Sequence, residues 1–162
     1  MKVLGVDPGL NVTGYGLIES TDRDMKLIEA GVIKTSSGRP ISDRLRRIYD
    51  GLSEIVDRNR PEVLVLEKIY SHYKHPVTAI LMGHARGAVC LLCGKYDIPL
   101  VNYASTHLKS AIAGRGRASK KQVAGMVRTL LRLDRLPEPE DVTDALALAI
   151  SHLHSATKIK GL

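Results

Sequence analysis

Four carboxylates stand at positions where they are able to act together. Asp7 follows the apolar segment KVLGV, and Glu67 follows EVLVL. Both segments have the length and composition of buried strands. The carboxyl ends of adjacent parallel strands meet at one edge of a sheet, so Asp7 and Glu67 are expected within reach of one ion. Asp141 and Asp144 lie three residues apart in the helical stretch DVTDALALAI and so share one face of that helix.

Taken singly, each acid also has a plain structural explanation. Asp-Pro-Gly is a good turn sequence. Acids in the first turn of a helix gain about 0.3–1 kcal/mol each from the helix dipole. The residues that follow, ALALAI, are apolar, however, and predict that this helix is buried beside the strand ends, where all four carboxylates would converge. Four oxygen ligands without Cys or His indicate a hard cation, Mg²⁺ or Mn²⁺.

The net charge of +7 comes from one segment of the chain. Between His107 and Arg135 there are eight lysines and arginines and one acid, which gives 8 − 1 = +7, while the remaining residues hold 16 basic and 16 acidic side chains. A solvated helix face usually mixes both signs, so this segment predicts a polyanionic partner, most commonly nucleic acid. A hard metal ion beside bound nucleic acid suggests phosphodiester hydrolysis by two ions.

The elements that must position these residues alternate between strand and helix patterns. Strands are predicted at 2–7, 15–20, 26–35, 62–67 and 99–104, and helices at 41–60, 77–96 and 141–158. Two shorter helices are expected between them, one capped by Ser105 and ending at Gly114, the other capped by Ser119. At 162 residues the chain is most simply one three-layer α/β domain, residues 1–162.

The apolar stretch 77–96 is expected to form a long, largely buried helix with Cys90 and Cys93 as core thiols. Its Gly83 and Gly87 lie one turn apart, a spacing that a helix packing on a partner subunit would use. Apolar runs are interrupted, and the N-terminus lacks a charged region followed by a hydrophobic stretch. We therefore expect a cytoplasmic protein with neither a membrane span nor a signal peptide.

Several segments together resemble the RuvC family of bacterial Holliday junction endonucleases. They are VLGVDPGLNVTGYGLI, VLVLEKIY, GHARGAV, the stretch from HLKSAIAG through ASKKQVAGMVRTLL, and DVTDALALAIS, and they extend over nearly the whole chain. The resemblance implies an RNase H-like fold with a mixed five-stranded sheet and helices on both faces. It also implies a homodimer that nicks a four-way junction symmetrically and leaves 5′-phosphate and 3′-hydroxyl ends. The family works in DNA recombination and repair, beside the RuvA and RuvB branch-migration proteins.

The resemblance assigns roles to individual residues as well. It carries the catalytic and metal-binding acids onto Asp7, Glu67, Asp141 and Asp144. Tyr70 stands where the family usually has Phe, and a Tyr ring would still stack on junction bases.

Basic residues of the segment 107–135 are the expected DNA contacts. Lys109 and Lys120 look like family lysines that hold DNA near the scissile phosphate. Lys121, Arg115 and Arg117 are expected to bind DNA on their charge alone.

Three other interpretations remain open at this point. Asp7, Gly9 and Gly14 resemble the first phosphate loop of the sugar kinase, Hsp70 and actin ATPases, which bind nucleotide between two such domains. A non-catalytic junction-binding module would keep the basic segment but would have no use for four acids in register. A related nuclease acting on RNA or on RNA–DNA hybrids would use the same scaffold, because one fold hosts many activities.

Overall fold

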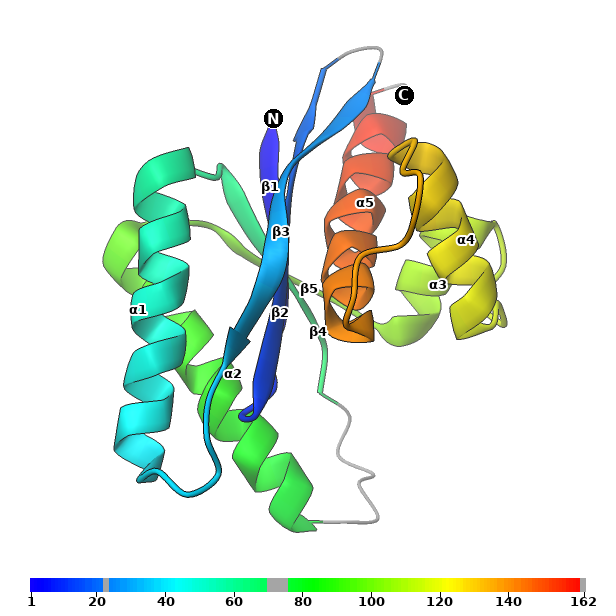
Figure 1. Cartoon of the computed structure of the whole chain (residues 1–162). Coiled ribbons are helices and arrows are strands. Elements are labelled where there is room, and N and C mark those ends of the chain that lie inside the picture. Colours follow the sequence, from blue (N-terminus) through cyan, green and yellow to red (C-terminus); the bar gives the residue numbers. More distant parts are fainter. Residues whose placement is uncertain (22–23, 70–75, 161–162) are drawn as a thin grey trace.

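A mixed five-stranded sheet stands between two layers of helices in the computed structural model of the chain (Figure 1). The structure describes residues 1–21, 24–69 and 76–160, without the side chains of residues 76 and 157–160. The strands are β1 (Lys2–Asp7), β2 (Val12–Ser20), β3 (Met25–Lys34), β4 (Val63–Glu67) and β5 (Leu100–Tyr103). The helices are α1 (Ile41–Asn59), α2 (Pro76–Tyr96), α3 (Ser105–Ala113), α4 (Lys120–Leu130) and α5 (Glu140–Lys160).

The strand order is β3-β2-β1-β4-β5. β1, β2 and β3 form an antiparallel meander, while β4 runs parallel to both β1 and β5. β4 lies between two strands and is buried on both faces, as its nearly unbroken apolar sequence predicts. The expected three-layer α/β fold with a mixed five-stranded sheet is therefore confirmed.

Strand register brings three strand ends to one edge of the sheet. Gly5 of β1 pairs with Val65 of β4, so Asp7 and Glu67 each stand two residues beyond a paired position. At the same edge, Val12 at the start of β2 pairs with Lys34 at the end of β3. Asp7, Glu67 and Lys34 therefore lie along a common edge.

Each face of the sheet has its own hydrophobic core. Alternate residues of β1 point to opposite sides, so Leu4 packs under α1 and α2, whereas Val3 packs under α5 with α3 and α4. In Figure 1 the α1–α2 layer and the α5–α4–α3 layer stand on opposite sides of the strands. The ALALAI stretch of α5 is buried along its whole length, as expected.

Glycines in β1 and β2 let α5 approach the sheet closely. A Cβ atom on Gly5 would lie 2.0 Å from the backbone oxygen of Ala145, and one on Gly14 would lie 2.2 Å from the backbone oxygen of Asp141. Any larger residue would push the start of α5 away from the strands. These two positions therefore set where the acids of α5 stand relative to Asp7.

The predicted caps of the short helices are right in one case and wrong in the other. Ser119 caps α4, and its side chain accepts from the backbone N–H of Gln122 in a capping box. Ser105, by contrast, is the first residue of α3, which begins after Ala104 without a side-chain cap. α3 does end at Gly114, whose φ of 73° suits glycine.

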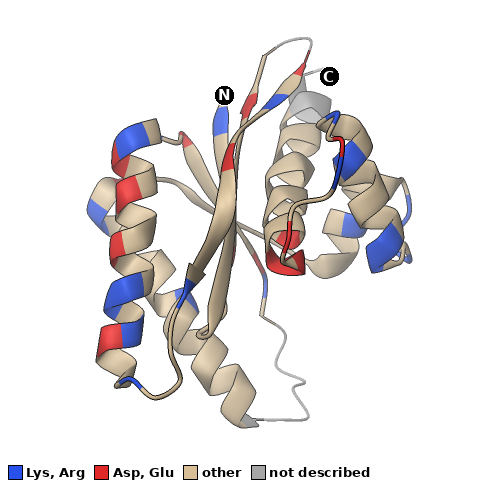
Figure 2. Ribbon diagram, in the orientation of Figure 1, with Lys and Arg blue, Asp and Glu red and all other residues tan. Residues whose placement is uncertain are grey.

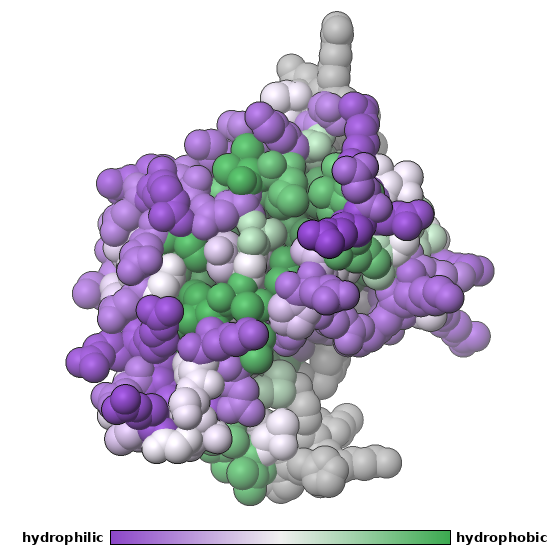
Figure 3. All heavy atoms as spheres, viewed as in Figure 1, coloured by the Kyte–Doolittle hydropathy of each residue, from purple (hydrophilic) through white to green (hydrophobic). Residues whose placement is uncertain are grey.

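The expectation that α2 is largely buried is wrong. Val77, Ile80 and Leu91 are 68%, 60% and 60% exposed, and of the two thiols Cys93 is buried but Cys90 is exposed. The helix is apolar on nearly all sides, so its sequence does not reveal which side faces solvent. Figure 3 shows apolar surface at the lower end of the molecule, next to the grey atoms.

α2 was also expected to be too interrupted to resemble a membrane span. By length and composition alone, Val77–Tyr96 is long and apolar enough for one, with a mean hydropathy of 1.5, and 22% of it is buried. Ala85, Val89 and Leu92 are fully buried in the core that α2 shares with α1. In this structure α2 is thus part of a helical layer on the sheet.

Candidate active site

Three of the four predicted acids line one cavity at the edge of the sheet. Asp7 enters it from the end of β1, Glu67 from the end of β4, and Asp144 from the second turn of α5. The cavity has a volume of about 330 Å³, and its wall includes Lys109 of α3 and Lys120 of α4. Five elements thus contribute charged side chains to a single site.

Asp141 lies beside this cavity in the first turn of α5. Its backbone contacts β2 at Gly14, the residue that pairs with Asp7. Its charge is close enough to raise the pKa of Asp7. The fourth acid therefore stands next to the other three but is not among the residues that line the cavity.

Among these acids, Asp7 has the pKa that is shifted most from its ordinary value. Burial raises its pKa from 3.8 to about 7, with further contributions from the negative charges of Asp144, Asp141 and Glu67. The positive charge of Lys120 opposes this shift but does not cancel it. The carboxylate form of Asp7 is therefore only partly compensated by positive charge.

Lys120 is paired with α5 in this structure. Its Nζ lies 3.2 Å from Asp144 Oδ2 and 3.4 Å from Glu140 Oε1. Burial alone would lower the pKa of Lys120, but the two carboxylates raise it. Burial also raises the pKa of Asp144, and Lys120 offsets only part of that shift. Glu140 was not among the predicted residues, although it precedes Asp141 directly in the sequence.

The oxygen atoms of these acids are suitable ligands for a divalent cation. Among the residues that the structure describes, no three Asp, Glu, His or Cys side chains have the arrangement of a metal-binding group. The donors are nevertheless all carboxylate oxygens, which suit a hard cation, and Asp7 has no adequate positive partner. A divalent ion would supply the charge that Lys120 alone does not.

The other predicted DNA contacts are distributed unevenly. Lys109 and Lys120 line the cavity, whereas Arg115 and Arg117 in the α3–α4 connection and Lys121 in the first turn of α4 are exposed outside it. Figure 2 shows basic residues on α4 and on the connection that precedes it. Tyr70 and residues 71–75 lie outside the described residues.

Arg86 of the α1–α2 layer contacts the site across the sheet and was not identified as a site residue from the sequence. Its Nη1 donates a hydrogen bond of 2.7 Å to the backbone oxygen of Glu67, and its Nη2 donates to Asn102 Oδ1. This single side chain of α2 thus joins the ends of β4 and β5. A contact between residues so far apart has no local sequence signal beyond an arginine in an apolar helix.

Comparison of the sequence with known proteins identifies one family. The family model described as crossover junction endodeoxyribonuclease RuvC matches residues 3–152. A protein of that name from Rhodopirellula baltica is 44% identical over 148 residues, covering 91% of this chain and 83% of the relative. Another from Pelotomaculum thermopropionicum is 43% identical over 157 residues, covering 97% and 95%.

Solved structures extend this likeness to three dimensions. The structure described as T. thermophilus RuvC in complex with Holliday junction substrate matches with a TM-score of 0.92 and 34% identity, over 98% of this chain and 96% of the other. The yeast mitochondrial Holliday junction resolvase Ydc2 matches with a TM-score of 0.70 at 14% identity, over 98% of this chain and 80% of the other, which shows a shared fold alone. The chain therefore belongs to the RuvC family of crossover junction endodeoxyribonucleases, which are divalent-metal-dependent nucleases.

Proposed function

We propose that this chain, as a single RNase H-like nuclease domain, resolves four-way DNA junctions in homologous recombination and DNA repair. It cuts by paired symmetric nicks that leave 5′-phosphate and 3′-hydroxyl ends. The observation that carries the proposal is the cavity lined by carboxylates from β1, β4 and α5 beside two lysines, in a chain whose relatives are crossover junction endonucleases.

The acids supply the metal site in this proposal. Asp7, Glu67, Asp141 and Asp144 would hold Mg²⁺, for which Mn²⁺ substitutes, since all their donor atoms are oxygens. When bound, two such ions activate the attacking water and stabilise the leaving 3′ oxygen. Burial and the charges of the neighbouring acids raise the pKa of Asp7, and the positive charge of the ions would offset both.

The lysines of the cavity hold the DNA backbone beside the acids. Lys109 and Lys120 line the same cavity as Asp7 and Glu67, so a phosphate between them would lie next to the metal site. Because Lys120 pairs with Asp144 and Glu140, binding of metal and DNA would move it from these carboxylates to a phosphate.

Farther from the cavity, other residues add affinity for the junction. Lys121, Arg115 and Arg117 are exposed and add to the positive field along the approach of the DNA. Tyr70 would stack on unpaired bases at the junction centre.

Two symmetric nicks require two active sites, which a homodimer supplies. The exposed face of α2 suits this contact. Ile80 and Leu91 are exposed on it, and a Cβ atom added at Gly83, Gly87 or Gly94 would meet nothing within 4 Å. At 100° per residue these five positions fall on one side of the helix, where glycines let a second helix approach closely. We propose a second copy of this chain as the occupant.

Family membership also suggests the setting in which the enzyme works. The resemblance of the sequence to RuvC supports a cytoplasmic location and action beside RuvA and RuvB. A pull-down of the purified protein with RuvA or RuvB on junction DNA would test the second point.

A nicking assay tests the proposed activity. With Mg²⁺, the purified protein should cut a synthetic four-way junction at symmetric positions, and Asp7→Asn should abolish incision while junction binding remains. Equal cutting of linear duplex, preferential cutting of an RNA–DNA hybrid, or full activity of Asp7→Asn would contradict the proposal. Loss of incision with retained binding also separates an enzyme from a non-catalytic binding module.

A further inference from the structure

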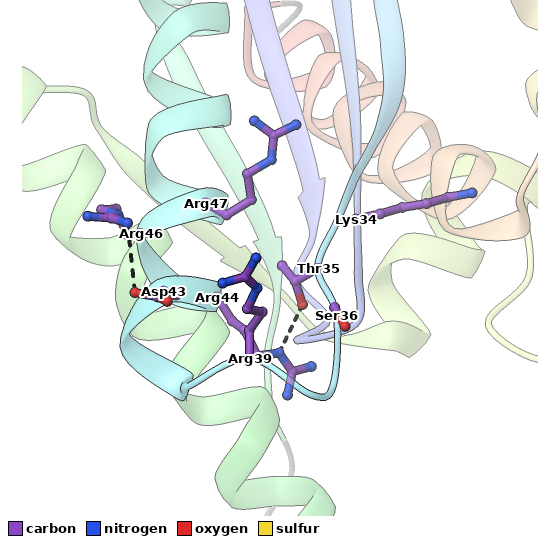
Figure 4. Close-up of a pocket in the computed structure, with 8 residues that line it drawn as sticks. All are labelled: Lys34, Thr35, Ser36, Arg39, Asp43, Arg44, Arg46 and Arg47. Atoms are coloured by element: carbon purple, nitrogen blue, oxygen red, sulfur yellow. Dashed lines mark hydrogen bonds and ion pairs between the residues drawn. The ribbon is translucent and has the colours of Figure 1, made fainter.

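A second, strongly basic pocket lies between the end of β3 and the start of α1 (Figure 4). It has a volume of about 400 Å³. Five of its lining residues are cations and one is an acid, which gives 5 − 1 = +4. The residues that line it are Lys34, Thr35, Ser36, Arg39, Asp43, Arg44, Arg46 and Arg47.

Only part of this positive charge is used within the fold. Arg44 is 9% exposed, and its Nε donates to Thr35 Oγ1 at 3.0 Å while its Nη2 donates to Asn11 Oδ1. Arg46 pairs with Asp43 at 3.7 Å, and both side chains are exposed to solvent. Arg44 therefore serves the structure of the pocket, and the Arg46 pair is a weak one.

Three cations of the pocket remain available. Within the described residues, the structure records no ion pair for Lys34, Arg39 or Arg47, and all three side chains are exposed. Clustered like charges repel one another unless an anion lies among them. The 19-residue helix α1 also begins here at Ile41, and its N-cap residue Pro40 provides no side-chain cap, so the first N–H groups of the helix add a partial positive charge.

The basic pocket lies at the same end of the sheet as the acids. Lys34 lines both this pocket and a neighbouring one that also includes Glu140 and Thr143 of α5. Glu140 in turn pairs with Lys120, which lines the cavity of Asp7 and Glu67. In Figure 4 Lys34 extends from β3 toward the side on which α5 lies. Lys34 and Glu140 therefore lie between the free cations and the proposed active site.

We propose that this pocket binds backbone phosphates of a double-helical arm of the DNA substrate, on the far side of β3 from the basic segment 107–135. The inference rests on the proposed function, since it concerns the same substrate. Duplex DNA fits better than a single small anion because Lys34, Arg39 and Arg47 are exposed and stand on β3, on the connection that follows it and on α1, and a duplex presents phosphates at regular intervals. Arginine is suited to this role because its planar guanidinium pairs with two phosphate oxygens.

The test compares two double variants of the full chain. Arg39→Gln with Arg47→Gln removes two free cations of the pocket and leaves the buried Arg44 in place. The matched control is Lys26→Gln with Arg60→Gln, which removes two exposed charges from the opposite ends of β3 and α1. Binding of a fluorescent four-way junction is measured by anisotropy against KCl concentration, in EDTA so that no strand is cut.

In the pocket variant, the slope of log K against log[salt] should become less steep by about 1 to 2, because each lost phosphate contact removes close to one unit. The control should keep the slope of the unmodified chain. When the junction arms are shortened stepwise, the difference between the unmodified chain and the pocket variant should disappear once the arms no longer reach the pocket.

Two results would overturn the inference. One is an unchanged slope in the pocket variant while the protein still prefers junctions over linear duplex, which leaves the proposed function intact. The other is competition by inorganic phosphate at constant ionic strength that is lost in the variant, together with a binding difference that does not depend on arm length. That result would identify a small-anion site. Absence of any preference for junctions in the unmodified chain would instead count against the proposed function.

Discussion

Replacing Asp7 by Asn should stabilise the metal-free fold at alkaline pH. Burial and the charges of Asp144, Asp141 and Glu67 raise the pKa of Asp7 from 3.8 to about 7. At pH 8 the folded protein must therefore hold an ionised carboxylate that is more stable in the unfolded chain. The difference of about 3 pKa units corresponds to a cost of up to about 4 kcal/mol at 1.36 kcal/mol per unit. Asn has nearly the same shape and carries no charge.

The sign of the effect follows from proton linkage. Between pH 4 and 7 the folded state holds a proton on Asp7 that the unfolded state has lost, so the free energy of unfolding falls as pH rises through this window. Above pH 7 both states are ionised, and the cost stays constant. Asp7→Asn lacks this titration. It should match the unmodified chain near pH 4 and exceed it by up to about 4 kcal/mol at pH 8.

Urea denaturation in EDTA at pH 4, 6 and 8 measures this difference. Asp50→Asn, an exposed acid of α1, is the control and should change stability by less than about 0.5 kcal/mol at each pH. Added Mn²⁺ should then raise the stability of the unmodified chain more than that of Asp7→Asn, because a ligand stabilises only the state that binds it. If Asp7→Asn is no more stable than the unmodified chain at pH 8, burial and the neighbouring carboxylates do not destabilise the ionised form of Asp7 as described.

Three further changes test other parts of the structure. Gly14→Ala should lower the free energy of unfolding by about 1–3 kcal/mol in urea titrations, since its Cβ would lie 2.2 Å from the backbone oxygen of Asp141. Arg86→Ala should raise the Mn²⁺ concentration needed for half-maximal incision because it frees the end of β4 at Glu67, and Arg86→Lys should restore this only in part. Unchanged metal dependence would contradict that role. Ile80→Glu should turn a dimer into a monomer in analytical ultracentrifugation, and an unaltered dimer would exclude the exposed face of α2.

Much of the fold could be predicted because its strands carry strong local signals. The apolar runs that end at Asp7 and Glu67 become neighbouring parallel strands, and this placement follows from the general behaviour of open α/β sheets. The cap at Ser119 could be predicted because Ser directly precedes a helical pattern, and the structure adds the second half of a capping box at Gln122. Local patterns of this kind depend on residues close in sequence.

What the sequence did not reveal depends on contacts between distant segments. α2 is apolar all round, so only the folded structure shows that Ile80 and Leu91 face solvent. The bond from Arg86 to the backbone of Glu67 has no local signature. The basic pocket was hidden for another reason, since the charges outside residues 107–135 cancel as a total even though five of the basic ones gather around the start of α1.

The position of bound metal ions is the most direct test of the proposed chemistry. Crystals of the protein soaked in Mn²⁺ and measured for anomalous diffraction should show Mn²⁺ bound by oxygens of Asp7 and Glu67, with Asp141 or Asp144 completing the site. Lys120 should have left Asp144 in the same crystals. Mn²⁺ bound only elsewhere, or four acids that stay unliganded at saturating Mn²⁺, would contradict a metal-dependent nuclease at this edge of the sheet.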